Sequence, residues 1–237
     1  MKYSRKLYSG EIAQEKENFG KLKTEFLKNF GDELEKLDYH NKSHTLKTLE
    51  HVELLAKLER ILPSEERYWD LKIAALYHDV GQTIQSKGHE KISSEYLESL
   101  LSRKGYNPMR IKNISKMIPY TEMPQRHSKD ICVKILQDAD LYSFGRDNFF
   151  ENGGLLRSEL EKKGIMNTNA KWYQSTLKIL KVHKFKTKSA KKLLNQKKRE
   201  NVKTLKKLIS NPPRLDKTIL NAYSISCYDL YNRFGLE

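Results

Sequence analysis

Apolar residues recur every three or four positions along most of this chain, which is the spacing of one face of an α-helix. Between residues 11 and 38, for example, one face carries Phe19, Leu22, Phe26 and Phe30. The same spacing predicts further helices at about 43–62, 64–81, 90–104, 108–118 and 128–144. The first half of the chain is therefore expected to be helical nearly throughout.

Residues that start and stop helices divide this pattern. Asn41 and Ser43 are suitable N-caps for the second helix. Pro63 should end that helix, and Ser64 should cap the next one. Gly81 is expected to stop the helix that begins at Ser64.

The second half of the chain continues in helices, with polar interruptions at 120–128 and at the sequence ENGG, 151–154. Helices are predicted at 155–163, 169–181, 181–207 and 214–233, with a break at NPP, 211–213. Alternating strand patterns are lacking, so the sequence predicts an all-α bundle with a C-terminal helical extension. We divide it into an N-terminal helix (1–38), a core (39–160) and a basic helical extension (161–237) packed on the same domain.

Composition fits a polar globular protein, with 38% hydrophobic and 32% charged residues. The first ten residues lack the apolar region of a secretory signal. The uncharged stretch 73–77 is far too short to cross a membrane, so no membrane association is expected. Cys132 and Cys227 form neither a disulfide framework nor a zinc-site spacing. A cytoplasmic protein is the simplest interpretation.

The net charge of +15 admits two interpretations. One is a polyanionic partner, such as nucleic acid or a phosphorylated metabolite. The other is genome composition, because lysine greatly outnumbers arginine, as in AT-rich genomes. The predicted helix 181–207 carries 12 Lys or Arg in 27 residues, which makes the basic C-terminal region a candidate surface for nucleic acid or simply a solvated helix face.

Candidate chemistry appears in the sequence ALYHDVG, where His78 and Asp79 end an apolar run. These side chains either reach solvent at a helix end or bind a metal ion, since buried charged groups need a partner. Imidazole and carboxylate together suit Zn, Mn, Fe or Ni, and carboxylate oxygens also suit Mg. Neighbouring side chains diverge on a helix, so this pair can chelate only where the helix ends, and Gly81 provides such an end.

Three segments together resemble the HD superfamily of metal-dependent phosphohydrolases. They are YHNKSHTLKTLEHVELLA, AALYHDVG and ILQDADLYSFGR. The resemblance assigns the metal ligands as His44, His78, Asp79 and Asp140. Asp138 is the alternative to Asp140, but it is better explained as a supporting or capping residue. The resemblance is clear over residues 39–160 and implies an HD-domain helical bundle.

Some members of that family bind a second metal through two more histidines. His89 occupies the place of the first, but the place of the second holds Thr121, and His127 lies in a predicted loop. We therefore expect one divalent ion (Mn, Mg, Fe, Ni, Co or Zn) and no second one. His89 then either contacts phosphate and transfers a proton, or is a surface residue at a helix N-terminus. His40 is either a supporting partner of the site or a surface residue near a cap.

The resemblance also implies roles in catalysis. Asp79 would ligate the metal and accept a proton from water, and His89 is our candidate acid for the leaving group. The candidates for binding the substrate are His89, Thr121, Arg146 and Arg157. Guanidinium groups match phosphate geometry, although salt bridges to neighbours such as Glu159 would equally explain the arginines. Gln82 stands where many relatives carry Lys, which removes one expected phosphate contact.

Three functions remain as hypotheses. The first is a phosphohydrolase or phosphodiesterase that acts on a nucleotide or related phosphorylated metabolite. The second is an HD fold without turnover that binds RNA or DNA through its basic surface. The third is a sensor that binds a nucleotide at an intact metal site. The intact set of four ligands favours chemistry, and the sequence predicts no particular oligomeric state.

Overall fold

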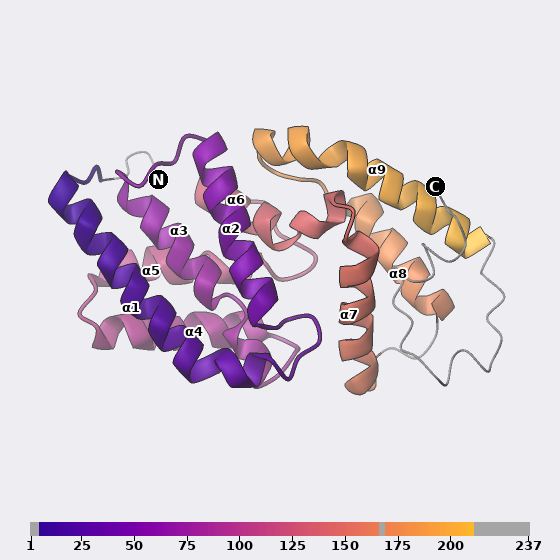
Figure 1. The fold of residues 1–237 in the computed structure, drawn as a ribbon, viewed down its shortest axis with the longest axis horizontal. Helices are drawn as coiled ribbons and strands as arrows, with labels where there is room; N and C mark the ends of the chain where they lie inside the picture. Colours follow the sequence, from indigo (N-terminus) through magenta and orange to yellow (C-terminus); the bar gives the residue numbers. More distant parts are fainter. Residues whose placement is uncertain (1–4, 166–168, 211–237) are drawn as a thin grey trace. The chain divides into compact units, whose positions relative to one another are not determined.

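A computed structural model describes residues 5–165 and 169–210 of the 237-residue chain (Figure 1). The described chain is α-helical, as predicted, and its backbone pairing between extended segments is a single bridge from Lys6 to Glu65. Contacts divide it into two compact units: unit 1 holds residues up to 141 together with 186–190, and unit 2 holds 142–185 and residues from 191 onward. Within the described ranges, every helix is too short or too polar to span a membrane.

Unit 1 is built around α3 (Glu66–Tyr77). Every residue from Trp69 to Tyr77 is buried, because α3 packs against α1, α2, α5 and α6. A helix buried on all sides belongs to the centre of a domain. The surrounding helices are α1 (Ser9–Leu34), α2 (Lys42–Leu58), α4 (His89–Arg103), α5 (Pro108–Ser115) and α6 (Ile131–Asp140). The residues that follow α3 in the chain therefore emerge in the interior.

The start of α3 differs from the prediction. Its N-cap is Glu65 and not Ser64, and no side chain caps it. The backbone there pairs with the N-terminal segment instead: Leu7 N donates to Ser64 O at 2.8 Å, and Glu66 N donates to Arg5 O at 3.0 Å. This pairing occupies backbone groups that a serine cap would otherwise serve, so the predicted cap was wrong.

Asn41 is the N-cap of α2, as predicted, because its Oδ1 accepts the backbone N–H of His44 at 3.0 Å. The end of α3 was predicted wrongly. The helix stops at Tyr77, and Gly81 lies in the following 3-10 helix η1 (Val80–Thr83). A Cβ at Gly81 would lie 2.2 Å from the backbone oxygen of His89. This glycine therefore serves a close approach between η1 and α4.

Asp138 fixes a distant segment of the chain to unit 1. Its carboxylate accepts hydrogen bonds from Lys186 N (2.7 Å), Thr187 N (2.7 Å) and Thr187 Oγ1 (2.8 Å). Glu59 Oε1 accepts from the N and Oγ of Ser189 at 2.8 and 2.7 Å. The carboxylate of Asp138 is therefore occupied by the segment 186–187, in line with the supporting role that the sequence favoured over that of a ligand.

Unit 2 contains a 3-10 helix η3 (Tyr142–Gly145), α7 (Phe149–Lys162), α8 (Asn169–Val182) and most of α9 (Lys188–Ser210). Its core includes Phe149, Phe150, Trp172, Tyr173, Leu180, Leu205 and Leu208. Asn201 Nδ2 donates to Phe144 O at 3.1 Å and to Arg146 O at 3.0 Å, which ties η3 to α9. A Cβ at Gly145 would lie 2.5 Å from Leu194, so only glycine fits this contact.

Two predictions for this half of the chain were wrong. The ENGG sequence at 151–154 is not a loop but part of α7, since the buried Phe149 and Phe150 anchor the helix start just before it. The predicted helix 181–207 is interrupted between Val182 and Lys188. There the backbone turns to meet Asp138. The predicted break at 211–213 and helix at 214–233 lie outside the described residues.

The division at residue 141 differs in position from the boundary at 160 expected from the sequence. The predicted assignment of 1–38, 39–160 and 161–237 remains a prediction. What the structure adds is that residues 186–190 belong with unit 1 although they lie far along the chain.

Candidate metal centre

His78 is the most deeply buried residue of the candidate site, with no exposed surface. It is the C-cap of α3, and its Nδ1 donates to the carbonyl of Ala75 at 2.8 Å. That bond fixes the ring and leaves Nε2 as the nitrogen available to a ligand. Burial of His78 follows directly from the central position of α3.

All four residues that the sequence nominates as ligands lie together within unit 1. His44 comes from the first turn of α2, His78 and Asp79 follow α3, and Asp140 ends α6. Nε2 of His44 lies 3.3 Å from Asp79 Oδ2 and 3.3 Å from Asp140 Oδ1. Nε2 of His78 lies 3.1 Å and 3.6 Å from the same two oxygens. Three helices thus deliver two imidazoles and two carboxylates to one place.

This donor set fits a divalent metal ion. Two ligand atoms that each lie about 2.1 Å from one ion are separated by about 3.0–3.4 Å, close to the four nitrogen–oxygen distances found here. His44 Nε2, His78 Nε2 and Asp79 Oδ2 are buried and make no well-formed hydrogen bond. Buried polar atoms normally have partners, so an ion would satisfy these three.

The four residues are not equivalent in position. Ligand atoms of His44, His78 and Asp140 all lie within 4.8 Å of one another. Asp79 falls outside that group of three, although its Oδ2 approaches both imidazoles. Asp79 is therefore placed to share its carboxylate between an ion and a further neighbour.

That neighbour is His89, the first residue of α4. Its Nε2 lies 3.1 Å from Asp79 Oδ1, and its Nδ1 lies 2.8 Å from Ser86 O. Both neighbours are acceptors, so the protonated ring can donate to both of them. The side chain of Gln82 also lies 3.1 Å from Nδ1. His89 therefore belongs to the candidate site, and the predicted surface position does not apply.

The electrostatics of the cluster follow from these contacts. Burial by itself would lower the pKa of His44 and His78, but the adjacent carboxylates of Asp79 and Asp140 raise both pKa values above the usual one. Burial would raise the pKa of Asp140, yet the two histidines lower it to about 2. They also hold the pKa of Asp79 well below its usual value. Without metal, protons on the imidazoles compensate the carboxylates.

The other predicted substrate-binding residues make contacts of their own, each within its own unit. The hydroxyl of Thr121 is buried and donates to Ile118 O at 2.8 Å. Arg157 Nε donates to Glu161 Oε1 at 2.7 Å, a salt bridge one helical turn apart. The guanidinium of Arg146 lies 5.8 Å from the ring centre of Tyr142. Both arginines belong to unit 2, and substrate binding by these three residues remains a prediction.

Sequence reasoning missed the contacts that support the site. Gly81 N donates to Ser93 Oγ at 2.9 Å, and this bond joins η1 to α4 beside His89. The ring of Tyr39 lies 4.8 Å from that of His44, measured between ring centres. His40, which the sequence offered as a possible supporting partner, has its ring centre 5.9 Å from that of His44 and 6.0 Å from that of His89. The pairing of glycine with serine across twelve residues leaves no local signal in the sequence.

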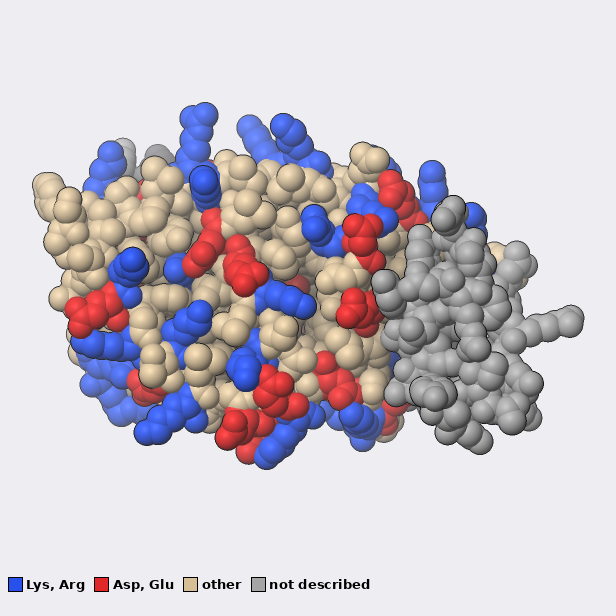
Figure 2. Space-filling view, in the orientation of Figure 1, with Lys and Arg blue, Asp and Glu red and all other residues tan. Residues whose placement is uncertain are grey.

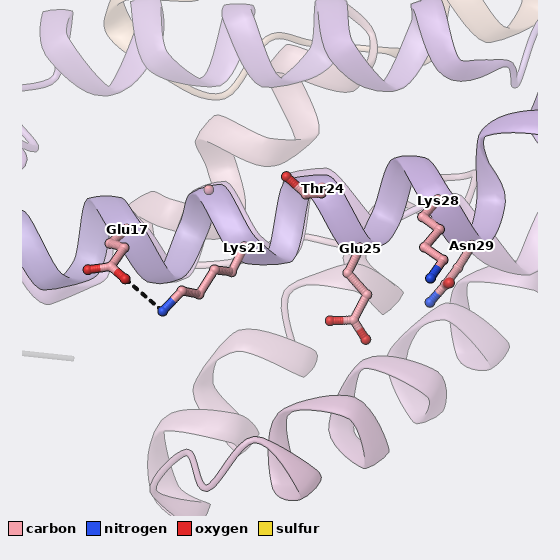
Figure 3. A pocket seen from close by; sticks show the side chains of 7 residues that line it. Glu17, Lys21, Thr24, Glu25, Lys28 and Asn29 are labelled. Atoms are coloured by element: carbon pink, nitrogen blue, oxygen red, sulfur yellow. Dashed lines mark ion pairs between the residues drawn. The ribbon is translucent and has the colours of Figure 1, made fainter.

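A second hollow lies on the surface of α1 (Figure 3). Its lining is polar and carries both signs of charge, and Lys21 pairs with Glu17 at 2.7 Å. The lining offers no histidine or cysteine, and its acidic residues stand on an exposed helix face. It does not compete with the buried cluster as a metal site.

Comparison with known proteins gave two findings. Residues 42–145 match the family model of the HD domain, a range that includes all four proposed ligands. The crystal structure of a predicted HD superfamily hydrolase from an uncultured Thermotogales bacterium aligns with a TM-score of 0.49 and 20% identity, over 82% of this chain and 91% of that one. A search of curated proteins gave no match.

Proposed function

We propose, from the match of residues 42–145 to the HD domain, that this chain is a metal-dependent phosphohydrolase or phosphodiesterase of the HD superfamily. The proposed substrate is a phosphoester of a nucleotide or a related phosphorylated metabolite. A divalent ion held by the buried cluster would be its cofactor.

One observation carries the proposal. Two imidazole nitrogens and two carboxylates from three helices meet in a buried place, and three of their atoms lack a well-formed hydrogen bond. A purely structural cluster would satisfy its buried polar atoms, because an unsatisfied one costs about 1–3 kcal/mol. A site that retains these atoms is better explained by a ligand that binds them.

The residues that would hold the ion are His44, His78, Asp79 and Asp140. A divalent ion at such a site supplies a lowered pKa for water and positive charge against a phosphoryl oxygen. The imidazoles must be neutral to act as ligands, so binding would release the protons that they carry in the metal-free protein.

Asp79 and His89 are the proposed proton-transfer residues. Asp79 would accept the proton of the attacking water, and its contact with His89 at 3.1 Å would orient the carboxylate. Burial alone would lower the pKa of His89, but Asp79 and the Ser86 carbonyl raise it above the usual value, which favours the protonated ring that a proton donor needs. His89 would give its proton to the leaving oxygen as the ester bond breaks.

The test is product release from a panel of mononucleotides, nucleoside di- and triphosphates and cyclic nucleotides, with Mn, Mg, Ni or Co supplied in turn. Wild-type protein is compared with Asp79→Ala, and metal content is measured for both. We expect turnover by the wild type with at least one metal and its loss in the variant. Bound metal without turnover on any substrate would overturn the enzymatic proposal and favour the nucleotide sensor.

A further inference from the structure

The excess positive charge of this protein is not spread evenly. The described part of unit 2 carries 16 Lys or Arg against 5 Asp or Glu, whereas that of unit 1, although longer, carries 25 against 22. Figure 2 shows basic and acidic side chains interspersed on the visible face of unit 1. A lysine-rich genome composition would raise the charge throughout the chain, so it does not account for this segregation.

The charge is concentrated on one face of α9. Between residues 171 and 210 there are 14 Lys or Arg and a single acidic residue, Glu200. The apolar face of α9 is packed into the core of unit 2 through Leu205 and Leu208, with Val202 and Ile209 beside them. The opposite face exposes Lys191, Lys192, Arg199, Lys203, Lys206 and Lys207.

These six cations have no acidic partner in the part of the chain that the structure describes. In residues 5–165 and 169–210, none of the six lies in an ion pair. Lys197 shows the contrast, because it pairs with Asp147 at 2.6 Å and with Glu200 at 3.5 Å. Exposed cations on a well-packed helix with no acidic partner form a surface of one sign.

The geometry of this surface is regular. At 100° per residue, Lys192, Arg199, Lys203 and Lys206 fall within about 60° of arc around α9. They span about 21 Å along the helix at 1.5 Å per residue. A nucleic-acid duplex carries about 12 phosphate charges over the same length. We propose that this stripe on α9 binds the phosphate backbone of double-stranded nucleic acid, independently of base sequence.

Two features favour a duplex over other polyanions. Single-stranded nucleic acid is normally held by aromatic side chains that stack on bases, and α9 contains no aromatic residue. An amphipathic helix that binds a membrane must bury its apolar face in lipid, whereas the apolar face of α9 is already covered by α7 and α8 residues. Charge complementarity to regularly spaced phosphates remains as the basis of recognition.

The test is fluorescence anisotropy with labelled 20-base-pair DNA and RNA duplexes, titrated with the full-length protein from 50 to 300 mM KCl. We expect binding with a Kd of about 1–100 μM near physiological salt. The logarithm of the binding constant should fall linearly with the logarithm of salt, with a slope of about −4 to −5. Binding of either duplex supports the proposal.

The decisive variant is Lys192→Gln/Arg199→Gln/Lys203→Gln/Lys206→Gln, in which the slope should become shallower by about 3–4. A matched control removes four exposed lysines of unit 1 (Lys16, Lys28, Lys57 and Lys112), and its slope should match the wild type. An equal reduction of duplex affinity and of the salt slope in both variants would overturn the proposal. So would the absence of duplex binding by the wild type at 50 mM KCl. Tighter binding to phosphatidylserine vesicles than to duplex would also overturn it. Asp79→Ala should bind duplex normally, so this outcome is independent of the proposed catalysis.

Discussion

Asp79 Oδ1 lies 3.1 Å from Nε2 of His89, and this contact joins the ligand cluster to the first turn of α4. The other oxygen of the same carboxylate faces His44 and His78. One side chain therefore links the residues that would hold a metal to the residue that would transfer a proton.

The first prediction concerns that carboxylate. Asp79→Ala removes a contact to three histidines at once, so it should reduce bound metal by at least tenfold and abolish turnover. Helicity should stay near the wild-type value, since the side chain carries no helix hydrogen bond of α3. Metal content by elemental analysis and far-ultraviolet circular dichroism check both expectations. Asp32→Ala, an exposed acidic residue of α1, is the control and should change neither.

A second prediction concerns the close contact behind His89. Gly81→Ala places a Cβ 2.2 Å from His89 O, so η1 and α4 must move apart. The free energy of unfolding should fall by about 1–3 kcal/mol, and His89 should lose its contact with Asp79. Denaturant unfolding and turnover measure the two effects.

Gly20→Ala is the matched control for that substitution. Its Cβ would meet nothing within 4 Å, and it lies inside α1. Alanine there should stabilise the protein by about 0.5–1 kcal/mol, because it restricts the unfolded chain and favours the helix. Similar responses to both substitutions would show that the contact at Gly81 does not constrain His89.

The third prediction is a pH dependence. The pKa values of His44 and His78 are raised in the metal-free fold, so they contribute stability that is complete below the unfolded pKa of about 6.5 and is lost as pH rises through the folded values. Metal binding needs these rings neutral, so it should strengthen over the same interval.

Thermal unfolding at pH 6–9, with EDTA or with Mn²⁺, measures this dependence. The melting temperature with EDTA should fall as pH rises, and the increment produced by Mn²⁺ should grow. An increment that is constant from pH 6 to 9 would mean that the imidazoles do not bind the ion.

A fourth prediction concerns a buried ion pair outside the site. Arg110 donates to Asp70 Oδ1 at 2.6 Å and to both oxygens of Glu15 at 2.6 and 2.9 Å, linking α5 to α3 and α1. Arg110→Met leaves two carboxylates without their cation. The free energy of unfolding should therefore fall by about 3–5 kcal/mol. Arg126→Met, at an exposed loop position, is the control and should cost little.

The loss of stability caused by Arg110→Met should depend on pH. Burial already raises the pKa of Asp70 to about 7 despite Arg110, and removal of the cation raises it further. A carboxyl group with a raised folded pKa loses stability as pH rises through that value, so the variant should be less impaired at pH 5 than at pH 8. Urea unfolding at both pH values gives the comparison, and an equal loss at both would contradict it.

Helical periodicity was readable from the sequence because it is a local signal. The four proposed ligands were assigned through the resemblance of three segments to the HD superfamily, since an adjacent His-Asp pair alone does not identify a metal site. The apolar spacing places the helices, and each ligand stands at a recognisable helix end. Helix boundaries were less accessible. Ser64 lost its capping role to backbone pairing with Leu7, a contact between residues 57 positions apart.

The contacts that support the site could not be predicted either, because they too depend on residues that are separated in the sequence. Gly81 suggested a helix stop, which is the usual local meaning of glycine, but its actual partners are His89 and Ser93. The ENGG sequence suggested a loop, yet buried aromatic residues before it keep the segment helical. Tertiary packing overrides local preference in both cases.

The hydrogen bonds from residues 186 and 187 to Asp138 limit how this protein can be shortened. A chain truncated after residue 141 or 160 would contain every proposed ligand but would lack the three donors that the Asp138 carboxylate uses in the interior. An uncompensated buried charge costs several kcal/mol, a large part of the 5–15 kcal/mol that typically separates folded from unfolded protein. The helices that carry the proposed ligands are therefore not expected to fold as an autonomous fragment, and deletions or gene fusions that aim to isolate them should retain residues 186–190.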